Sequence, residues 1–476
     1  MTSPPGSPAP PAGRPGASLG AHSVVYLVGT ALQGLGVLLV LPFATRVLGS
    51  TGFGRVATGL VVVQMVGTIA AAGLPQVILR EHHRGAEGPR VARALAGTMV
   101  LLGVGLGIIG LGVAVALSAA GHADLAQWLP LVVASVGLTT VVSGQTLMRA
   151  RLQPWGFLAL AVVATVGAQL AGVVAARADR SAATYLTAYA AVVVLAAVLA
   201  LVLGRPLSPT AEPVRVRAGV RLAAPLLPQA VAMLGLLSGD VLLTGWFVGT
   251  AAAGEYQVAL QLGNMPFVLA VALFNAWGPL VLSRPLADRW AWTARTGTAL
   301  TTVVGAGAAG VALLGPWLVA VMAAPSFDRA EIVTALGVVS MVAVAYMVYQ
   351  GSSLAVLDVE RTGRLAWAAL AALTVLVVAA WLLTSRAGLG LVGVAVAKAL
   401  AYVVLMAVTT WAAVRHSPLR WPVRLVVVGV ASVLLALVGA FLPGDGVGLW
   451  LRAGLAVVVA GAALALAPGV LRSLRG

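Results

Sequence analysis

Long apolar stretches separated by short polar turns run along the whole chain. The hydrocarbon core of a bilayer is about 30 Å thick, and a helix crosses it with about 20 apolar residues. Helix is the expected conformation, because an isolated span in hydrocarbon must satisfy its own backbone hydrogen bonds. We therefore predict an all-α, polytopic integral membrane protein with about 14 transmembrane helices, at residues 22–45, 56–79, 94–120, 128–148, 156–176, 185–204, 222–247, 256–282, 296–323, 331–355, 365–384, 391–414, 425–442 and 449–471.

The basic residues give this bundle an orientation. The chain has 28 arginines and a single lysine, Lys398. If the N-terminus is cytoplasmic, 21 of the arginines fall on the inner side and 7 on the outer side, as the positive-inside rule requires. We predict a multi-pass protein of a bacterial cell (plasma) membrane with cytoplasmic N- and C-termini. Topology also explains the net charge of +16, so no nucleic acid partner is expected.

The loops and the tail divide the chain into regions. The Pro-, Gly-, Ser- and Ala-rich N-terminus is typical of a disordered segment. The longest loop follows the sixth span and is too short for a folded domain. The predicted organisation is a disordered cytoplasmic tail at 1–21, an N-terminal six-helix lobe at 22–204, a cytoplasmic linker at 205–221, a C-terminal six-helix lobe at 222–414, and two additional helices with the cytoplasmic C-terminus at 415–476.

Residues for covalent, metal or nucleotide chemistry are scarce. The chain has no cysteine, and none of its five histidines has an acidic partner at ligand spacing. It contains no Walker A motif, no GxGxxG after a strand and no Ser/His/Asp arrangement. We expect no enzyme activity, no catalytic residues, no metal and no cofactor, and membrane lipids as the surroundings.

An internal repeat relates the two halves. "VLGSTGFGRVATGL" at 47–60 aligns with "FVGTAAAGEYQVAL" at 247–260, so that Gly54 matches Gly254. "LPQVILR", ending at Arg80, aligns in the same way with "GPLVLSR", ending at Arg284. Six helices per unit is an even number, so both halves enter the membrane the same way round. This predicts a pseudo-twofold axis along the membrane normal, with substrate between the lobes.

The same segments carry a family resemblance. "RVLGSTGFGRVA" followed by "GLPQVILRE", and in the second half "LLPQ…GDVLLTGWFVGTAAAGEYQVALQLGNMPF…GP", resemble the oligosaccharide (O-antigen and exopolysaccharide) flippases. These polysaccharide biosynthesis proteins belong to the multidrug/oligosaccharidyl-lipid/polysaccharide (MOP) exporter superfamily, with multidrug/cation antiporters and lipid II flippases. The resemblance covers specific residues only around 41–81 and 222–285. Fourteen helices depart from the twelve expected of the oligosaccharide branch.

The resemblance implies a function. A flippase of this family moves a polyprenyl-diphosphate-linked oligosaccharide from the inner to the outer leaflet by alternating access, for cell-surface polysaccharide synthesis. Its partners are then the lipid-linked oligosaccharide, H⁺ or Na⁺ if a gradient drives transport, and associated polysaccharide polymerases or glycosyltransferases. Three alternatives stay open: a cation-coupled multidrug antiporter, a non-catalytic component of an envelope polymer synthase, and a membrane enzyme, which the short loops disfavour.

Polar residues inside the spans are candidates for the substrate or ion pathway. Amides and hydroxyls at helical spacing share one face, and such a face turns to the bundle interior or to a water-filled cavity. The eighth span carries the longest stripe. Interhelical hydrogen bonding is the competing, purely structural interpretation. The candidates are Gln257, Gln261, Asn264 and Asn275 in the eighth span, Gln229 in the seventh, Gln33 in the first, and Tyr346 and Gln350 in the tenth.

Two charges lie deep in the second lobe. Asp240 is about seven residues inside the outer end of the seventh span, and Lys398 about eight residues inside the outer end of the twelfth. A lone charge at such depth is costly, so mutual pairing is one explanation. In the other interpretations, Lys398 attracts the diphosphate of the lipid carrier, or Asp240 takes up a proton or cation.

Overall fold

A computed structural model describes residues 16–121, 125–359 and 363–475, with side chains from residue 36 onward apart from a few near the C-terminus. Most of the predicted disordered tail lies outside these residues, and its last part, from Gly16, belongs to the first helix. Every regular element in the described part of the chain is helical, which confirms the all-α prediction.

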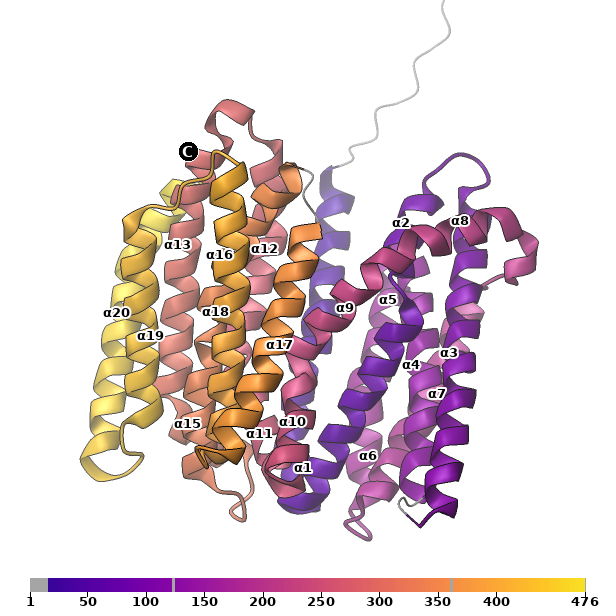
Figure 1. The fold of residues 1–476 in the computed structure, drawn as a ribbon, viewed down its shortest axis with the longest axis horizontal. Helices are drawn as coiled ribbons and strands as arrows, with labels where there is room; N and C mark the ends of the chain where they lie inside the picture. Colours follow the sequence, from indigo (N-terminus) through magenta and orange to yellow (C-terminus); the bar gives the residue numbers. More distant parts are fainter. Residues whose placement is uncertain (1–15, 122–124, 360–362, 476) are drawn as a thin grey trace, which may run out of the picture.

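The long helical stretches run up and down the bundle, and several consist of two or more consecutive elements (Figure 1). The short elements η1 and η4 are π-helical turns, and η2 and η3 are 3₁₀ turns. In chain order the elements are α1 (Gly16–Ala71), α2 (Leu74–His82), α3 (Gly88–Ala119), α4 (Leu125–Ala150), α5 (Pro154–Ala161), η1 (Val162–Gly167), α6 (Ala168–Ala176), α7 (Ala182–Gly204), η2 (Pro209–Ala211), α8 (Pro213–Ala223), η3 (Ala224–Leu226), α9 (Leu227–Leu234), η4 (Gly235–Gly239), α10 (Asp240–Phe247), α11 (Thr250–Gly263), α12 (Met265–Ser283), α13 (Leu286–Leu313), α14 (Gly315–Met322), α15 (Arg329–Ser340), α16 (Val342–Asp358), α17 (Gly363–Ser385), α18 (Gly390–His416), α19 (Val423–Phe441) and α20 (Gly446–Arg475).

The number of spans agrees with the sequence prediction once α1 is divided. Thirteen helical stretches of the described chain are long and apolar enough to cross a membrane. The first contains Gly49, whose φ of 66° breaks the helix into two arms that meet at one end of the bundle (Figure 1). Gly249, its match in the repeat, also has a positive φ, 135°. Glycine adopts this backbone region without strain. The two arms of α1 correspond to the first two predicted spans.

Two groups of helices stand side by side (Figure 1). The first lobe contains α2 to α7, drawn in purple, and the second contains α10 to α18, drawn from magenta to orange. The last two helices, α19 and α20, pack against α13 at the outer side of the second lobe. This layout confirms the predicted two lobes with two C-terminal helices, while the exact domain boundaries stay predictions.

Close helix packing within the first lobe, and between the second lobe and α19, depends on small residues. A Cβ added to Gly144 of α4 would lie 2.7 Å from the Cβ of Ala200 in α7. A Cβ added to Gly337 of α15 would lie 2.6 Å from the Cβ of Ala440 in α19. Helices in a bilayer associate largely through such close contact, because lipid tails are as apolar as the side chains they would replace.

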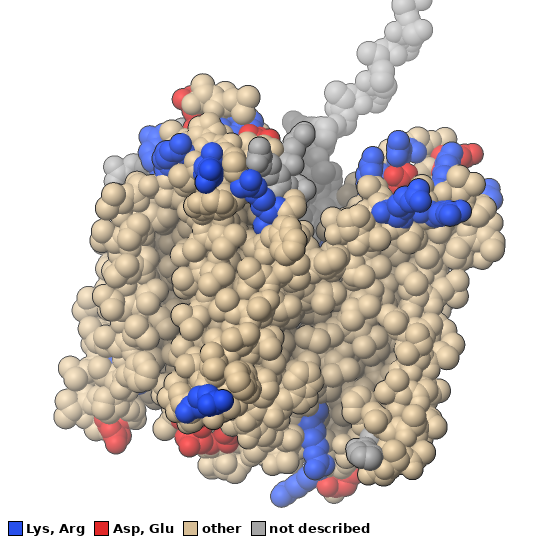
Figure 2. Space-filling view, viewed as in Figure 1, with Lys and Arg blue, Asp and Glu red and all other residues tan. Residues whose placement is uncertain are grey.

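Arginine side chains gather at one end of the bundle (Figure 2). This separation agrees with the charge bias expected from the loops. We call the arginine-rich end of the bundle the basic end. The opposite end, which contains the turns at Gly49 and Gly249, is the far end. Arg80 and Arg84 lie at and just after the end of α2, Arg215 in α8, Arg289 in the first turn of α13 and Arg420 between α18 and α19, which places them at this end of the bundle (Figure 1).

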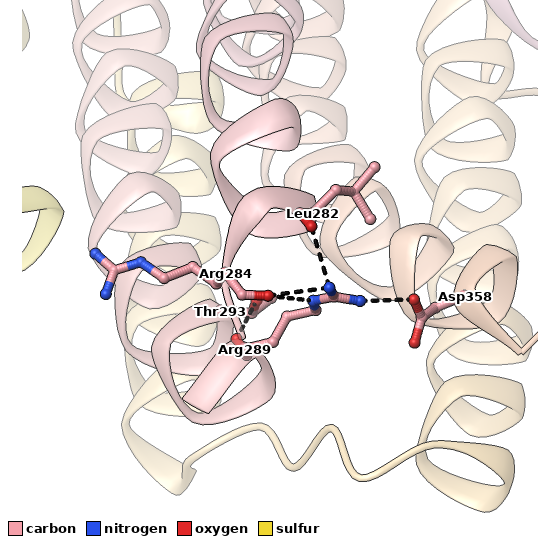
Figure 3. Close-up of polar contacts among 5 residues, drawn as sticks. All are labelled: Leu282, Arg284, Arg289, Thr293 and Asp358. Atoms are coloured by element: carbon pink, nitrogen blue, oxygen red, sulfur yellow. Dashed lines mark hydrogen bonds and ion pairs between the residues drawn. The ribbon is translucent and has the colours of Figure 1, made fainter. Parts of the chain in front are cut away.

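Arg289 joins three helices at the basic end of the second lobe (Figure 3). Its guanidinium forms an ion pair with Asp358 at the end of α16, 2.8 Å between Nη1 and Oδ1. It also donates to the carbonyl oxygens of Leu282 and Arg284, at 3.1 and 3.0 Å, which caps the end of α12. The hydroxyl of Thr293 donates to the Arg289 carbonyl at 2.7 Å. These bonds hold the α12–α13 turn against α16.

The linker at 205–221 is folded, which the sequence did not reveal. Its second part forms α8, which lies across the basic end of the first lobe and continues through η3 into α9 (Figure 1). Gly219 brings α8 onto α3, since a Cβ there would lie 2.7 Å from Cδ2 of Leu95. The arginines of α8 face outward, and they made the segment look like a polar loop. The buried side of the helix, at Val216 and Gly219, gave no sign of a helix in the sequence reading.

Candidate functional site

The two lobes meet at the far end through matching positions of the repeat. Gly54, in the second arm of α1, faces Gly254 in α11. A Cβ on Gly54 would lie 1.8 Å from the carbonyl oxygen of Thr250, and a Cβ on Gly254 would lie 2.3 Å from that of Ser50. Only glycine allows two backbones to approach this closely. The sequence repeat therefore corresponds to a reciprocal contact between the lobes.

The contact continues from the far end into the membrane. A Cβ on Gly245 of α10 would lie 3.2 Å from Cγ2 of Thr58, and a Cβ on Gly239 would lie 3.3 Å from Cε of Met65. From Thr58 to Met65 the second arm of α1 thus runs against the seventh span for about two turns. The lobes are closed over this depth.

Beyond Met65 the lobes separate and border an open cavity of about 710 Å³. One wall consists of the second arm of α1 with α2 and α4, and the other of η3, α9 and η4. The polar side chains of the lining are Gln64, Thr68, Gln76 and Gln229, and no charged side chain stands among the described residues that line the cavity. Such amides and hydroxyls, set among apolar residues, can orient a neutral polar ligand through hydrogen bonds.

The seventh span, which forms the second wall, is irregular. Pro225 and Pro228 accompany the η3 turn and the start of α9, and the π-helical turn η4 follows at Gly235–Gly239. A π turn leaves the regular backbone ladder and is frequent at functional sites. Here the carbonyl oxygen of Leu237 in η4 accepts a hydrogen bond from Nζ of Lys398 at 2.8 Å. The side chain of Leu237 lines the cavity.

Asp240 and Lys398 form a buried ion pair behind this wall. Nζ of Lys398 lies 2.8 Å from Oδ2 of Asp240, and both side chains have 0% exposed surface. The hydroxyl of Tyr256 donates to the same carboxylate oxygen at 2.7 Å. The pairing considered from the sequence is therefore present, and it joins α10, α11 and α18 within one lobe.

Aromatic rings border the ion pair on the α18 side. Tyr402, one helical turn after Lys398, is buried, and its hydroxyl has no hydrogen-bond partner among the described residues. Phe267 stacks on Tyr346 with ring centroids 4.1 Å apart and meets Tyr402 edge to face at 5.9 Å. The predicted pathway residue Tyr346 thus belongs to a ring cluster inside the second lobe, and the neighbouring Gln350 is half-buried.

The predicted stripe of the eighth span is divided. The chain leaves regular helix at Asn264, between α11 and α12, with Pro266 at the start of α12. Gln257 and Gln261 are half-buried, and Asn275 is exposed. None of these side chains is among those that line the 710 Å³ cavity. A single continuous helix was the wrong assumption, while the role of the stripe in a substrate path stays a prediction.

Two other predicted candidates have different outcomes. Gln229 lines the cavity from α9. Gln33 lies in α1, but its side chain falls outside the described residues. Gln64, Thr68 and Gln76, on the opposite wall, were not among the residues predicted from the helix faces. The four-residue spacing of Gln64 and Thr68 was the available signal.

Two histidines close α2 at the basic end. The rings of His82 and His83 meet edge to face with centroids 5.1 Å apart. Burial, and the nearby His83 and Arg151, lower the pKa of His82. The lowered pKa favours the neutral form of the His82 imidazole.

A family model described as "Polysaccharide biosynthesis protein" matches residues 19–283, more than half of the chain. The chain belongs to this family. None of the curated proteins compared with this polysaccharide biosynthesis protein matches it in sequence.

Solved structures with the same fold include a lipid II flippase and two transporters described as members of the MOP superfamily. The lipid II flippase MurJ in an inward closed conformation superposes with a TM-score of 0.65 at 12% identity, covering 96% of this chain and 100% of MurJ. A MOP superfamily transporter from Pyrococcus furiosus gives 0.56 at 13% identity, covering 84% and 95% of the two chains. An inward-facing multidrug resistance MATE family transporter gives 0.57 at 14% identity, covering 83% and 98%. At these identities the likeness establishes the fold alone.

Proposed function

We propose that this protein flips a polyprenyl-diphosphate-linked oligosaccharide from the cytoplasmic to the outer leaflet by alternating access, as a transporter and not an enzyme. The observation that carries the proposal is the cavity between the lobes, closed at the far end by Gly54 and Gly254. Membership of the polysaccharide biosynthesis family supports a glycolipid substrate.

The basic end is assigned to the cytoplasm. Arginines concentrate in the cytoplasmic loops of polytopic proteins, and here they concentrate where α2 ends and α3 begins. The cavity walls extend toward that end, from Gln64 to Gln76 on one side and from Leu237 to Leu226 on the other. This conformation is then the one that accepts substrate from the inner leaflet.

The neutral lining is suited to the sugar part of the substrate. A volume of about 710 Å³ lies within the range of about 300–1,000 Å³ that is common for small-molecule sites. Sugar hydroxyls both donate and accept hydrogen bonds, and so do the side-chain amides of Gln64, Gln76 and Gln229. The polyprenyl chain is apolar and would remain in the bilayer beside the lobes.

The Asp240–Lys398 pair is assigned a structural role in this mechanism. Lys398 neutralises Asp240 within the protein, and neither side chain reaches solvent. We propose that the pair holds the cavity wall to α18 as the lobes move, and that it does not bind H⁺ or Na⁺ from solution. Coupling to a gradient would then depend on other groups.

Flipping by purified protein in proteoliposomes tests the proposal. The substrate is a polyprenyl-diphosphate-linked oligosaccharide, and a membrane-impermeant glycosidase reports the sugar exposed on the outside. We expect protein-dependent exposure, reduced severalfold by Gln76→Leu and Gln229→Leu. Gln153→Leu is the matched control, because Gln153 is exposed before α5 and away from the cavity. Exposure equal to that of protein-free vesicles would refute the flippase proposal, and export of a cationic dye instead would favour the antiporter.

A further inference from the structure

A second hollow lies at the basic end of the first lobe. It has a volume of about 410 Å³ and lies between the end of α2, the start of α3 and α8. It continues from the central cavity along α2 on one side and from η3 to α8 on the other. Gln76 of α2 lines the cavity, and Arg80, one turn later, lines the hollow. Leu226 and Leu222 are related in the same way on the other side. We call this hollow the α2–α8 pocket.

The lining of the pocket is predominantly positive. Arg80, Arg84 and Arg215 contribute three guanidinium groups, and Glu81 contributes one carboxylate. Arg84 pairs with Glu81 at 3.3 Å, and Arg215 pairs with Glu87 at 2.7 Å. The side chains of Arg84 and Arg215 in these pairs are 68% and 48% exposed. Exposed ion pairs contribute little to stability. Both arginines can therefore turn to a more strongly charged ligand.

Arg80 is the pocket arginine whose guanidinium is available for a ligand. Among the described residues it has no ion pair or hydrogen-bond partner for its guanidinium. Its match in the repeat, Arg284, lies over the ring of Trp292 at 4.6 Å from the centroid. The second lobe thus packs this arginine on an aromatic ring, and the first lobe presents it to an open pocket.

The pocket also involves the connection between the lobes. Its α8 wall belongs to the linker and leads through η3 to α9, the wall of the central cavity. Besides the Arg215–Glu87 pair, Arg90 of α3 pairs with Glu212 before α8 at 3.1 Å. A ligand held between Arg80 and Arg215 would add a bridge from α2 to α8.

We propose that the α2–α8 pocket binds the diphosphate group of the lipid carrier at the membrane surface, before the oligosaccharide enters the central cavity. This inference rests on the proposed flippase function. A guanidinium binds phosphate oxygens in a two-pronged, charge-assisted geometry, and a diphosphate offers enough oxygens for two or three such groups. The pocket lies at the end of the spans, where phosphate headgroups lie, and one helical turn from the sugar cavity.

Binding to the purified full-length protein in phosphatidylcholine nanodiscs tests the pocket without requiring transport. The probe is geranylgeranyl diphosphate, with geranylgeraniol, phosphatidylglycerol and inorganic pyrophosphate as comparison ligands. We expect Arg80→Gln/Arg215→Gln to weaken probe binding about tenfold or more, as the loss of charged hydrogen bonds implies. The control Arg217→Gln/Arg221→Gln removes the same charge from α8 outside the pocket and should change binding less than twofold. Competition by pyrophosphate supports recognition of the diphosphate itself.

Three results would overturn the proposal. Equal weakening in both double variants would mean diffuse surface attraction. Equal affinity for geranylgeraniol would exclude phosphate recognition. Displacement of the probe by phosphatidylglycerol at similar concentration would make the pocket a site for bulk anionic lipid.

Thiol labelling gives a second readout that leaves the arginines in place. The native chain has no cysteine. Ala218→Cys lines the pocket, whereas Val214→Cys lies on the same helix with 80% of its side chain exposed and outside the lining. Geranylgeranyl diphosphate should protect position 218 and leave 214 reactive, and equal reactivity at 218 with and without the probe contradicts the proposal. Binding without flipping would refute only the flippase function, while flipping without binding would refute only the pocket.

Discussion

The carboxylate of Asp240 and the ammonium of Lys398 lie 2.8 Å apart, with no exposed surface on either side chain. The pair connects α10 to α18, and Lys398 also bonds the carbonyl of Leu237, whose side chain lines the central cavity. A charge pair inside one lobe therefore fixes the wall that faces the other lobe.

Breaking this pair should destabilise the protein. Removal of one partner from a buried ion pair leaves an uncompensated charge and costs about 3–5 kcal/mol. Asp240→Asn and Lys398→Gln should each lower the unfolding temperature in detergent, and Asp240→Asn/Lys398→Gln should recover most of the loss and also transport. A stable double variant that does not transport would assign the pair a direct functional role. Single variants as stable as wild type would contradict the structural role, and loss of gradient dependence in Asp240→Asn alone would identify the carboxylate as the coupling site.

The glycine contact at the far end should control closure. A Cβ at Gly54 or Gly254 would lie 1.8 or 2.3 Å from a carbonyl oxygen of the other lobe, so alanine must push the lobes apart. We expect Gly54→Ala and Gly254→Ala to increase the reactivity of a cysteine placed at Ser50 toward reagents added from the far end. Gly105→Ala is the control, because its Cβ meets nothing within 4 Å. If the cysteine at position 50 reacts no faster in Gly54→Ala and Gly254→Ala, the glycine contact does not limit opening of the far end.

Cysteine labelling can determine both the cavity and its orientation. Ala230 lines the cavity from α9, and Ala232, two residues later, has 0% exposed surface. A membrane-impermeant thiol reagent should label Ala230→Cys from the cytoplasmic side and leave Ala232→Cys unlabelled. Labelling of Ala230→Cys only from the outside would reverse the assigned topology. Gln257→Cys and Gln261→Cys, compared with the buried Ala259→Cys, test the helix-face prediction in the same experiment.

The sequence predicted the features that follow from the bilayer. Apolar length determines a span and arginine placement separates the two ends, so the path of the chain was recognisable. The repeat was recognisable because matching glycines meet where backbones touch, as Gly54 and Gly254 do. Asp240 and Lys398 were identified because isolated charges deep in a membrane require a partner.

The features missed depend on how helices turn and pack. Periodicity does not reveal the break at Asn264 or the π turn at Gly235–Gly239, and these decide which side chains face the cavity. Gln76 lies in α2, beyond the turn at Gly73 that separates this helix from α1. Helical spacing therefore could not predict that Gln76 and Gln64 line the same cavity. The α2–α8 pocket could not be predicted, because one of its walls is the linker helix α8, which folds back onto the first lobe.

Alternating access requires the far end to open, and a disulfide across the closed contact tests this requirement most directly. Gly245 and Thr58 come from opposite sides of the contact, with the Gly245 Cβ position 3.2 Å from Cγ2 of Thr58, so cysteines there are close enough to form a disulfide. We expect oxidised Thr58→Cys/Gly245→Cys protein to lose flipping of the lipid-linked oligosaccharide in proteoliposomes and to regain it on reduction, with both single variants active in either state. Full flipping by the quantitatively cross-linked protein would contradict the rocking of the two lobes about this contact.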